Sequence, residues 1–184
     1  MDIFGGSEAS GGWIGWKSEA ETWDIDGEKC KVTKLLIDPQ SLQTGWGLVK
    51  RGSPPDFVWA DIAGTKIQQP SPEYRVAVSL SVFASAKYGA PNDGKRTWRT
   101  NGFANIHAIR KIWPEIHEGA KANPGKWAVV NVTASEVIQT KFKDVNVPVL
   151  ALGGWANLPE EQPAPPPPPP PVIEPSPADD EEFF

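Results

Sequence analysis

The sequence predicts a mostly β domain of five strands, with one helix between the third and fourth strands, followed by a tail without a core. Residues 74–87 alternate apolar with small or polar side chains, which is typical of a strand that buries one face. Residues 104–120 place isoleucines at three- and four-residue steps, which is typical of a helix. Seven consecutive prolines at 165–171 favour an extended chain that buries little apolar surface.

The segment before the predicted domain has no sustained hydrophobic period. Residues 1–28 are rich in glycine and acidic side chains, and Trp13, Trp16 and Trp23 are spread through them. We therefore expect a loosely ordered lead-in rather than part of the domain.

Two strands are predicted before the alternating one. Residues 29–38 are rich in β-forming residues and stop at Pro39, and residues 43–51 form a second run after a short turn. These two strands are able to pair. Turn sequences at 53–56 and 69–72 then break the chain on either side of a short apolar piece.

The alternating strand has a second face that is not a core face. Its odd-numbered positions are alanine or serine except for Arg75, Phe83 and Lys87, and after a turn residues 95–99 interleave three cations with an indole. This mixture favours binding of single-stranded nucleic acid, because bases stack on rings while cations neutralise phosphates. The alternative is a solvated hairpin in which Trp98 packs inward.

The predicted helix is followed by further β-rich segments. Pro114 lies inside the helical pattern and either kinks the helix or divides it. After a turn at 123–125, a strand is expected over 126–133, a further β-rich piece covers 137–143, and residues 145–155 close the domain. The expected organisation is a lead-in over 1–28, the domain over 29–157, and a linker with an acidic tail over 158–184.

This order of strands and helix is that of an oligonucleotide/oligosaccharide-binding (OB) barrel, in which the helix sits between strands 3 and 4. An immunoglobulin-like sandwich has more strands and no such helix, and a doubly wound sheet has alternating helices that the sequence lacks. The strand count stays open by one or two. We therefore expect an OB-type barrel.

Charge is distributed unevenly along the chain. The formal net charge is −5, but residues 29–158 hold 17 Lys and Arg against 9 Asp and Glu, a balance of +8. A basic domain with acidic flanks suits a polyanionic ligand. The alternative is that the lysines are scattered over a solvated surface.

The end of the sequence carries a recognisable combination of features. After the prolines, four carboxylates at 179–182 precede Phe183 and Phe184. The combination resembles bacterial and bacteriophage single-stranded DNA-binding proteins, which have an OB domain, a low-complexity linker and an acidic tip ending in phenylalanine. The resemblance is specific over the last six residues. Over the rest of the chain it consists only of the order of domain, linker and tail. The alternative is a solubilising acidic tail.

The resemblance implies a sequence-nonspecific protein that coats single-stranded DNA in replication, recombination and repair, and that recruits partner proteins through its tail. A further hypothesis is that the carboxylates and phenyl rings of the tail occupy the empty DNA site and are displaced by DNA. Trp127 is one further candidate for stacking. The implied DNA-binding residues are Trp46, Lys50, Arg51, Trp59, Arg75, Phe83, Lys87, Lys95, Arg96, Trp98 and Arg99, and the implied partner-binding residues are Asp179, Asp180, Glu181, Glu182, Phe183 and Phe184.

We expect neither an enzyme nor a cofactor or metal site. The sequence lacks phosphate-loop, dinucleotide-binding and HExxH motifs, its one cysteine is Cys30, and His107 and His117 have no acid or thiol in register. No run of about 18 apolar residues and no signal peptide is visible, so we expect a cytoplasmic protein, in the host cytoplasm if phage-encoded. The oligomeric state stays open. The alternative functions are a proline-rich adaptor or a phage structural protein that binds protein rather than DNA.

Overall fold

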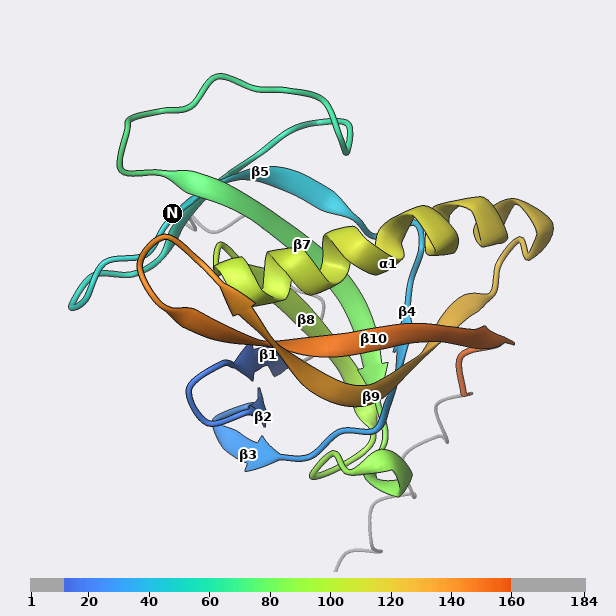
Figure 1. Cartoon of the computed structure of the whole chain (residues 1–184). Coiled ribbons are helices and arrows are strands. Elements are labelled where there is room, and N and C mark those ends of the chain that lie inside the picture. Colours follow the sequence, from blue (N-terminus) through green and yellow to red (C-terminus); the bar gives the residue numbers. More distant parts are fainter. Residues whose placement is uncertain (1–11, 160–184) are drawn as a thin grey trace, which may run out of the picture.

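The computed structural model describes residues 12–159, so the predictions for residues 1–11 and for the linker and tail at 160–184 lie outside the described residues. The described residues form a mostly β domain with one long helix (Figure 1). Hydrogen bonds connect their ten strands into one open sheet. The elements are β1 (Gly12–Lys17), β2 (Thr22–Ile25), β3 (Glu28–Cys30), β4 (Lys34–Ile37), β5 (Gln43–Leu48), β6 (Asp56–Trp59), β7 (Arg75–Ala84), η1 (Ala86–Tyr88), β8 (Gly94–Thr100), α1 (Phe103–Ala122), β9 (Trp127–Gln139) and β10 (Asp144–Ala156).

The predicted mostly β class with one helix is confirmed, but the prediction of five strands is wrong. The predicted strand at 29–38 is divided into β3 and β4, whereas the strand predicted at 126–133 continues into the β-rich piece at 137–143 to form one strand, β9. β9 stays continuous because it pairs along its whole length with β10. Four more strands lie outside the predicted ones: β1 and β2 in the expected lead-in, β6 in the short apolar piece, and β8 in the segment after the turn that follows β7.

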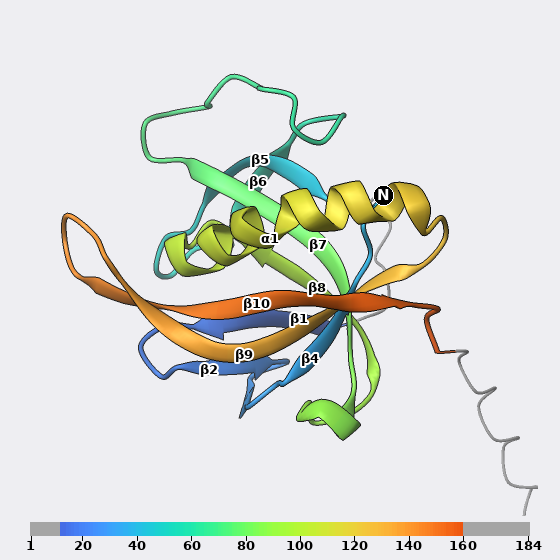
Figure 2. The ribbon, with the colours of Figure 1, turned by 45° about the vertical axis from the view of Figure 1, so that its right-hand side comes forward.

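The centre of the sheet is β7. It pairs with β8 along one edge, and with β5 and then β4 along the other edge. β4 also pairs with β9, which pairs with β10. The strands therefore curve around a core that lies between the sheet and α1 (Figure 2).

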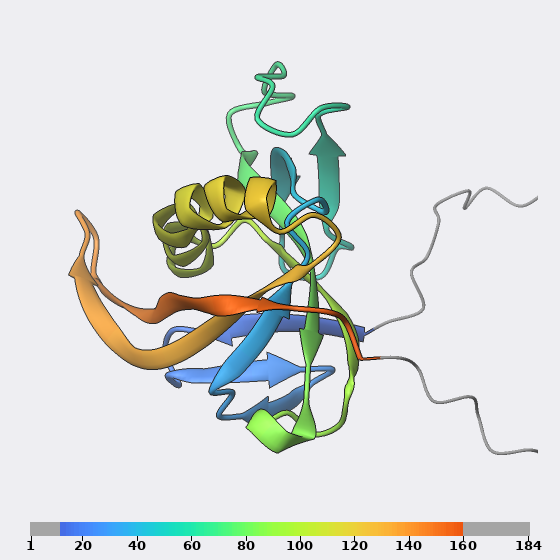
Figure 3. The ribbon, with the colours of Figure 1, turned by 90° about the vertical axis from the view of Figure 1, so that its right-hand side faces the viewer.

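The helix covers one face of the sheet. α1 is a single helix that continues through Pro114, which is exposed on its outer side. Its buried side chains include Ile109, Ile112 and Ile116, at the three- and four-residue steps of the sequence pattern. Figure 3 shows α1 on one side of β5, and β6, which pairs with β5, on the other side. Among the described residues, no helix is both long enough and apolar enough to cross a membrane.

The prediction of a loosely ordered lead-in is wrong for residues 12–28. β1 pairs with β8 in parallel and with β2 in antiparallel orientation, and β2 pairs with β3. Asp26 and Gly27 connect β2 to β3 with positive φ angles of 53° and 89°, as in the two-residue hairpin turns that Asp-Gly favours. This dipeptide was the sequence signal for the hairpin, and the glycine-rich composition around it obscured the signal.

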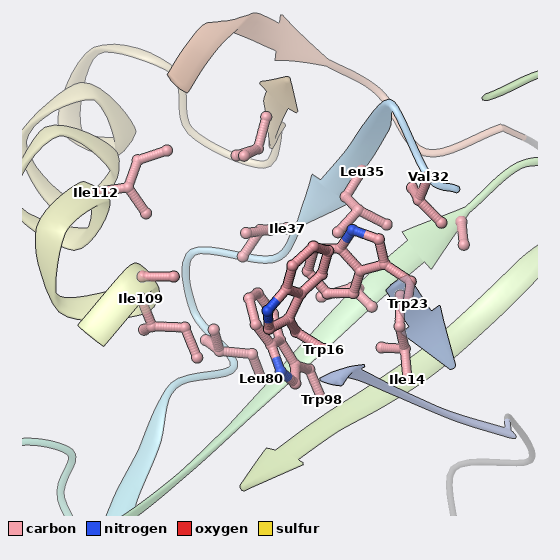
Figure 4. Close-up of a cluster of buried hydrophobic side chains, with 14 of the residues drawn as sticks. Ile14, Trp16, Trp23, Val32, Leu35, Ile37, Leu80, Trp98, Ile109 and Ile112 are labelled. Atoms are coloured by element: carbon pink, nitrogen blue, oxygen red, sulfur yellow. The ribbon is translucent and has the colours of Figure 1, made fainter. Parts of the chain in front are cut away.

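Three tryptophans form the centre of the core (Figure 4). The ring centroids of Trp16 and Trp23 lie 5.6 Å apart and those of Trp23 and Trp98 lie 5.1 Å apart, both in edge-to-face geometry. The side-chain oxygen of Asn105 accepts hydrogen bonds of 2.9 Å from the Trp98 indole and from the Trp16 backbone N–H. Trp16 in turn donates from its indole to the Asn146 carbonyl of β10 at 2.9 Å. The N-terminal strands are thus an integral part of the domain.

Candidate nucleic-acid interface

One face of strands β4 to β8 is turned away from α1, and we call it the outer face. Side chains alternate along a strand, and residues paired across antiparallel strands share a face, so the strand register identifies the members. The opposite face of β7 carries core residues such as Leu80 and Val82. The members of the outer face are Lys34, Leu36, Gln43, Gly45, Gly47, Phe57, Trp59, Arg75, Ala77, Ser79, Ser81, Phe83, Lys95, Thr97 and Arg99.

Two aromatic rings of β6 are stacked on the outer face. Phe57 and Trp59 have ring centroids 5.3 Å apart and planes that differ by 5°, and both side chains are partly exposed. Their spacing of two residues places them on the same side of the strand. Gly47 lies opposite Phe57 on β5, and a Cβ atom there would lie 2.6 Å from the Phe57 ring. The missing side chain therefore makes room for the ring pair, which we call the Phe57–Trp59 platform.

An arginine from β8 lies against this platform. The guanidinium carbon of Arg99 is 5.5 Å from the Phe57 ring centroid and 5.7 Å from that of Trp59, within cation–π range of both. Arg99 is exposed and forms no ion pair with any residue of the described range. Its charge is therefore available to an anion that reaches the platform.

The outer face is positively charged. Its charged members are Lys34, Arg75, Lys95 and Arg99, and none of its members is Asp or Glu. Its polar uncharged members are Gln43, Ser79, Ser81 and Thr97, of which Ser79 is buried, as is the neighbouring Ala77. A face with one sign of charge attracts a polyanion over a distance of about one Debye length, roughly 8 Å at physiological salt.

A second cationic aromatic group lies beyond the end of β7. The Tyr88 ring of η1 has the Lys34 ammonium 4.4 Å from its centroid and the Lys87 ammonium 5.5 Å away. The carboxylate of Asp93 holds this turn by accepting hydrogen bonds from the Ser85 hydroxyl at 2.8 Å and from the next backbone N–H. These hydrogen bonds lower the pKa of Asp93, so the carboxylate stays ionised and anchors the turn at pH values below the ordinary pKa of a carboxyl.

Two residues predicted to contact DNA, Arg96 and Trp98, do not lie on the outer face. Trp98 is 0% exposed in the core, and Arg96 is buried with its Nε atom 2.8 Å from the Asp26 carboxylate. The reason is the alternation of β8, which turns Lys95, Thr97 and Arg99 to the outer face and Arg96 and Trp98 toward the core. The interleaved cations and indole of this segment are thus divided between two faces.

Three other predicted residues do not lie on the outer face. Trp46 is on the α1 side of β5, where its indole donates to the Ile67 carbonyl at 3.0 Å. Lys50 forms a 2.9 Å ion pair with Glu73, and Arg51 is exposed in the loop after β5. The structure therefore brings together only part of the predicted set.

The remaining predicted residues lie on the outer face or beside it. Trp59, Arg75, Phe83, Lys95 and Arg99 are members of the face. Lys87 adjoins it through η1, and the half-buried Trp127 begins β9, on the side shared with Leu36.

Sequence reasoning missed Phe57 and Tyr88. The alternation of Phe57, Val58 and Trp59 was a signal for two rings on one side of a strand, but the segment was interpreted only as a short apolar piece. Trp13 was also missed as a surface residue. It is 45% exposed, pairs with Thr97 of the outer face, and has the Lys17 ammonium 5.6 Å from its ring centroid.

Comparison with known proteins finds no matching family model, no similar curated protein and no similar solved structure. Within residues 12–159, no cluster of three His, Cys, Asp or Glu side chains is arranged to hold a metal ion.

Proposed function

We propose that this chain binds single-stranded DNA without sequence preference and coats exposed strands during replication, recombination and repair. The observation that carries the proposal is the Phe57–Trp59 platform beside Arg99, on a face whose charged members are all cations. Every base has a flat apolar surface, so stacking on such rings contributes about 1–3 kcal/mol per base whatever the sequence. Lysine and arginine neutralise the phosphates between the stacked bases.

The pairing of the strands supports a finer proposal about the fold. β4 and β5 together pair with β7, β7 pairs with β8, β4 pairs with β9, and β9 pairs with β10, with α1 between β8 and β9. An OB barrel has these neighbours and binds oligonucleotides on its second and third strands, which correspond here to β7 and β8. We propose an OB-type barrel opened by β1, which lies next to β8 where a smaller barrel would close.

Partner recruitment is the second part of the proposal. Residues 179–184 supply four carboxylates and two phenyl rings within one short segment, and we refer to them as the acidic–aromatic segment. A partner protein with an apolar pocket and a basic rim complements this chemistry. We propose that replication and recombination proteins bind the chain through this segment.

We expect oligo-dT to quench the tryptophan fluorescence of the protein, with an affinity that falls linearly in a plot of log affinity against log salt. Each phosphate neutralised on a single strand contributes about −0.7 to the slope. Arg99→Gln should therefore make the slope shallower by about 0.7. The measurement is a fluorescence titration repeated at four or more salt concentrations.

Lys121→Gln is the matched control, because it removes one cation from α1, on the other side of the sheet. Its slope should equal that of the unchanged protein. Failure of the unchanged protein to bind oligo-dT at low salt would contradict the proposed function. It would favour the alternative of an adaptor or structural protein that binds protein partners.

Gly47→Ala should lower the affinity for oligo-dT about fivefold, corresponding to roughly 1 kcal/mol of lost stacking. The new methyl group would lie 2.6 Å from the Phe57 ring and 3.1 Å from the Ala77 Cβ atom, so the ring must leave its stacked position. Gly15→Ala is the control, since a Cβ atom there meets nothing within 4 Å. Equal affinities for the two variants, measured by the same titration, would contradict a role for the platform.

A further inference from the structure

A large apolar groove lies on the opposite side of the sheet from the outer face. It has a volume of about 790 Å³ and runs between α1, the α1 side of β5, and the loop at 61–67. Trp46 of β5 and Trp113 of α1 contribute indole rings to its wall, and Ile109 forms part of its floor. Pockets of this volume hold drug-sized ligands, so the groove has room for two phenyl rings. We call it the α1–β5 groove.

The loop that forms one wall is tied to β5. The Trp46 indole donates to the Ile67 carbonyl at 3.0 Å, and the Thr44 hydroxyl accepts a 2.8 Å hydrogen bond from the Gly64 N–H. The Ala60 N–H also donates to the Thr44 carbonyl at 2.9 Å. These bonds hold both ends of the wall, so the groove is formed before any ligand enters it.

The rim of the α1–β5 groove is basic. Lys66, Arg110 and His117 line it, and no lining residue is Asp or Glu. Neither Lys66 nor Arg110 forms an ion pair with any residue between 12 and 159. A ligand that fits must therefore present apolar groups to the floor and negative charges to the rim.

We propose that the acidic–aromatic segment of the same chain docks in the α1–β5 groove, with Phe183 and Phe184 between the two indoles and the carboxylates at the basic rim. The segment matches the groove in both properties, because it joins two phenyl rings to four consecutive carboxylates. The outer face offers cations as well, but its two rings already stack on each other and form no enclosed apolar cavity.

The connecting chain is long enough to reach the groove. Residues 160–178 separate the described domain from the segment, and nineteen residues span at most about 60 Å. A domain of this size is roughly 40 Å across, so every point of its surface is within reach. Tethering also raises the effective concentration of the segment to the millimolar range, so a weak contact is sufficient.

Docking in the groove would withhold the segment from partner proteins without blocking the outer face. This regulation differs from competition with DNA, in which the segment would occupy the DNA site. The proposal does not depend on DNA binding, since neither the groove nor the segment includes a member of the platform.

The test uses the full chain labelled with 5-fluorotryptophan, whose nine tryptophans give separate ¹⁹F resonances that single Trp→Phe variants assign. Comparison with the Phe183→Ala/Phe184→Ala variant should show shifted resonances for Trp46 and Trp113 and an unshifted resonance for Trp59. The shifts should be independent of protein concentration. Adding the peptide Asp-Asp-Glu-Glu-Phe-Phe to the variant should restore them.

Arg110→Glu should weaken the binding of this peptide roughly five- to tenfold, because one attractive charge pair becomes repulsive. Lys111→Glu is the matched control, since Lys111 is the next residue of α1 but pairs with Glu136 of β9, away from the groove. Unshifted Trp46 and Trp113 resonances would overturn the proposal. A shift at Trp59 would place the segment on the outer face, and shifts that vanish on dilution would place it on a second copy; either result also overturns docking within one chain.

Discussion

Trp98→Ala should lower the free energy of unfolding by about 3–5 kcal/mol, the range for removing a large buried aromatic side chain. Trp98 is fully buried, and its ring packs edge-to-face on Trp23 at a centroid distance of 5.1 Å. Truncation would leave a cavity at the junction of β8, β2 and α1. It would also leave the Asn105 side-chain oxygen with one hydrogen bond fewer in a buried position.

The measurement is urea denaturation followed by circular dichroism on the full chain. Trp59→Ala is the matched control, because it removes the same side chain from a partly exposed position. We expect the control to lose at most about 1–2 kcal/mol, since less apolar area leaves the solvent there. A Trp98→Ala variant as stable as this control would contradict the burial of Trp98. The result separates a core role from the DNA-stacking role that the sequence suggested for this residue.

The double variant Phe57→Ala/Trp59→Ala should lower the affinity for oligo-dT by about 2–6 kcal/mol, at least thirtyfold. Each ring is expected to stack one base, and each stacked base contributes about 1–3 kcal/mol. Arg99 loses its position over both rings as well, because its guanidinium lies against them in the folded protein. The effect should therefore exceed that of Arg99→Gln, which leaves the stacking surface in place.

Fluorescence anisotropy of labelled oligo-dT at low salt measures this loss without depending on the tryptophans that are removed. Phe103→Ala is the control, since Phe103 is 50% exposed at the start of α1, on the other side of the sheet. The control should bind like the unchanged protein. A double variant that keeps its affinity while remaining folded would show that DNA, if bound, does not use the platform.

The two double variants of this protein test separate surfaces. Removal of the Phe57–Trp59 platform should affect DNA binding and leave peptide binding in the α1–β5 groove unchanged. Removal of the two phenyl rings at 183 and 184 should affect the groove and leave the affinity for oligo-dT unchanged. Failure of the first expectation would contradict DNA binding through the platform. Failure of the second would contradict docking of the acidic–aromatic segment in the groove. The two results can therefore be distinguished.

Local patterns were sufficient to predict much of the secondary structure. The alternation at 74–87 predicted β7, and the isoleucine steps at 104–120 predicted α1, which extends from Phe103 to Ala122. The N-terminal strands β1 to β3 were missed because they are short and lie in a segment rich in glycine and acidic residues. Their stability comes from distant contacts, such as the hydrogen bond of Trp16 to Asn146 across 130 positions of sequence.

The candidate site was predicted only in part, for a geometric reason. Alternation with a period of two shows that Lys95 and Arg99 share one face of a strand and that Arg96 and Trp98 share the other. It does not show which of these faces the core covers. That choice depends on β1 and α1, which pack on the side of Trp98 and leave the side of Arg99 open.

Sequence patterns were enough to predict the mostly β class, the position of α1, and the basic character of residues 29–158 between acidic flanks. The burial of Trp98, and the meeting of Phe57, Trp59 and Arg99 on one exposed face, became evident only in the folded structure. The physical reason is that local periodicity fixes which side chains share a face. Burial and juxtaposition instead depend on segments that are far apart in the chain and pack together only when it folds.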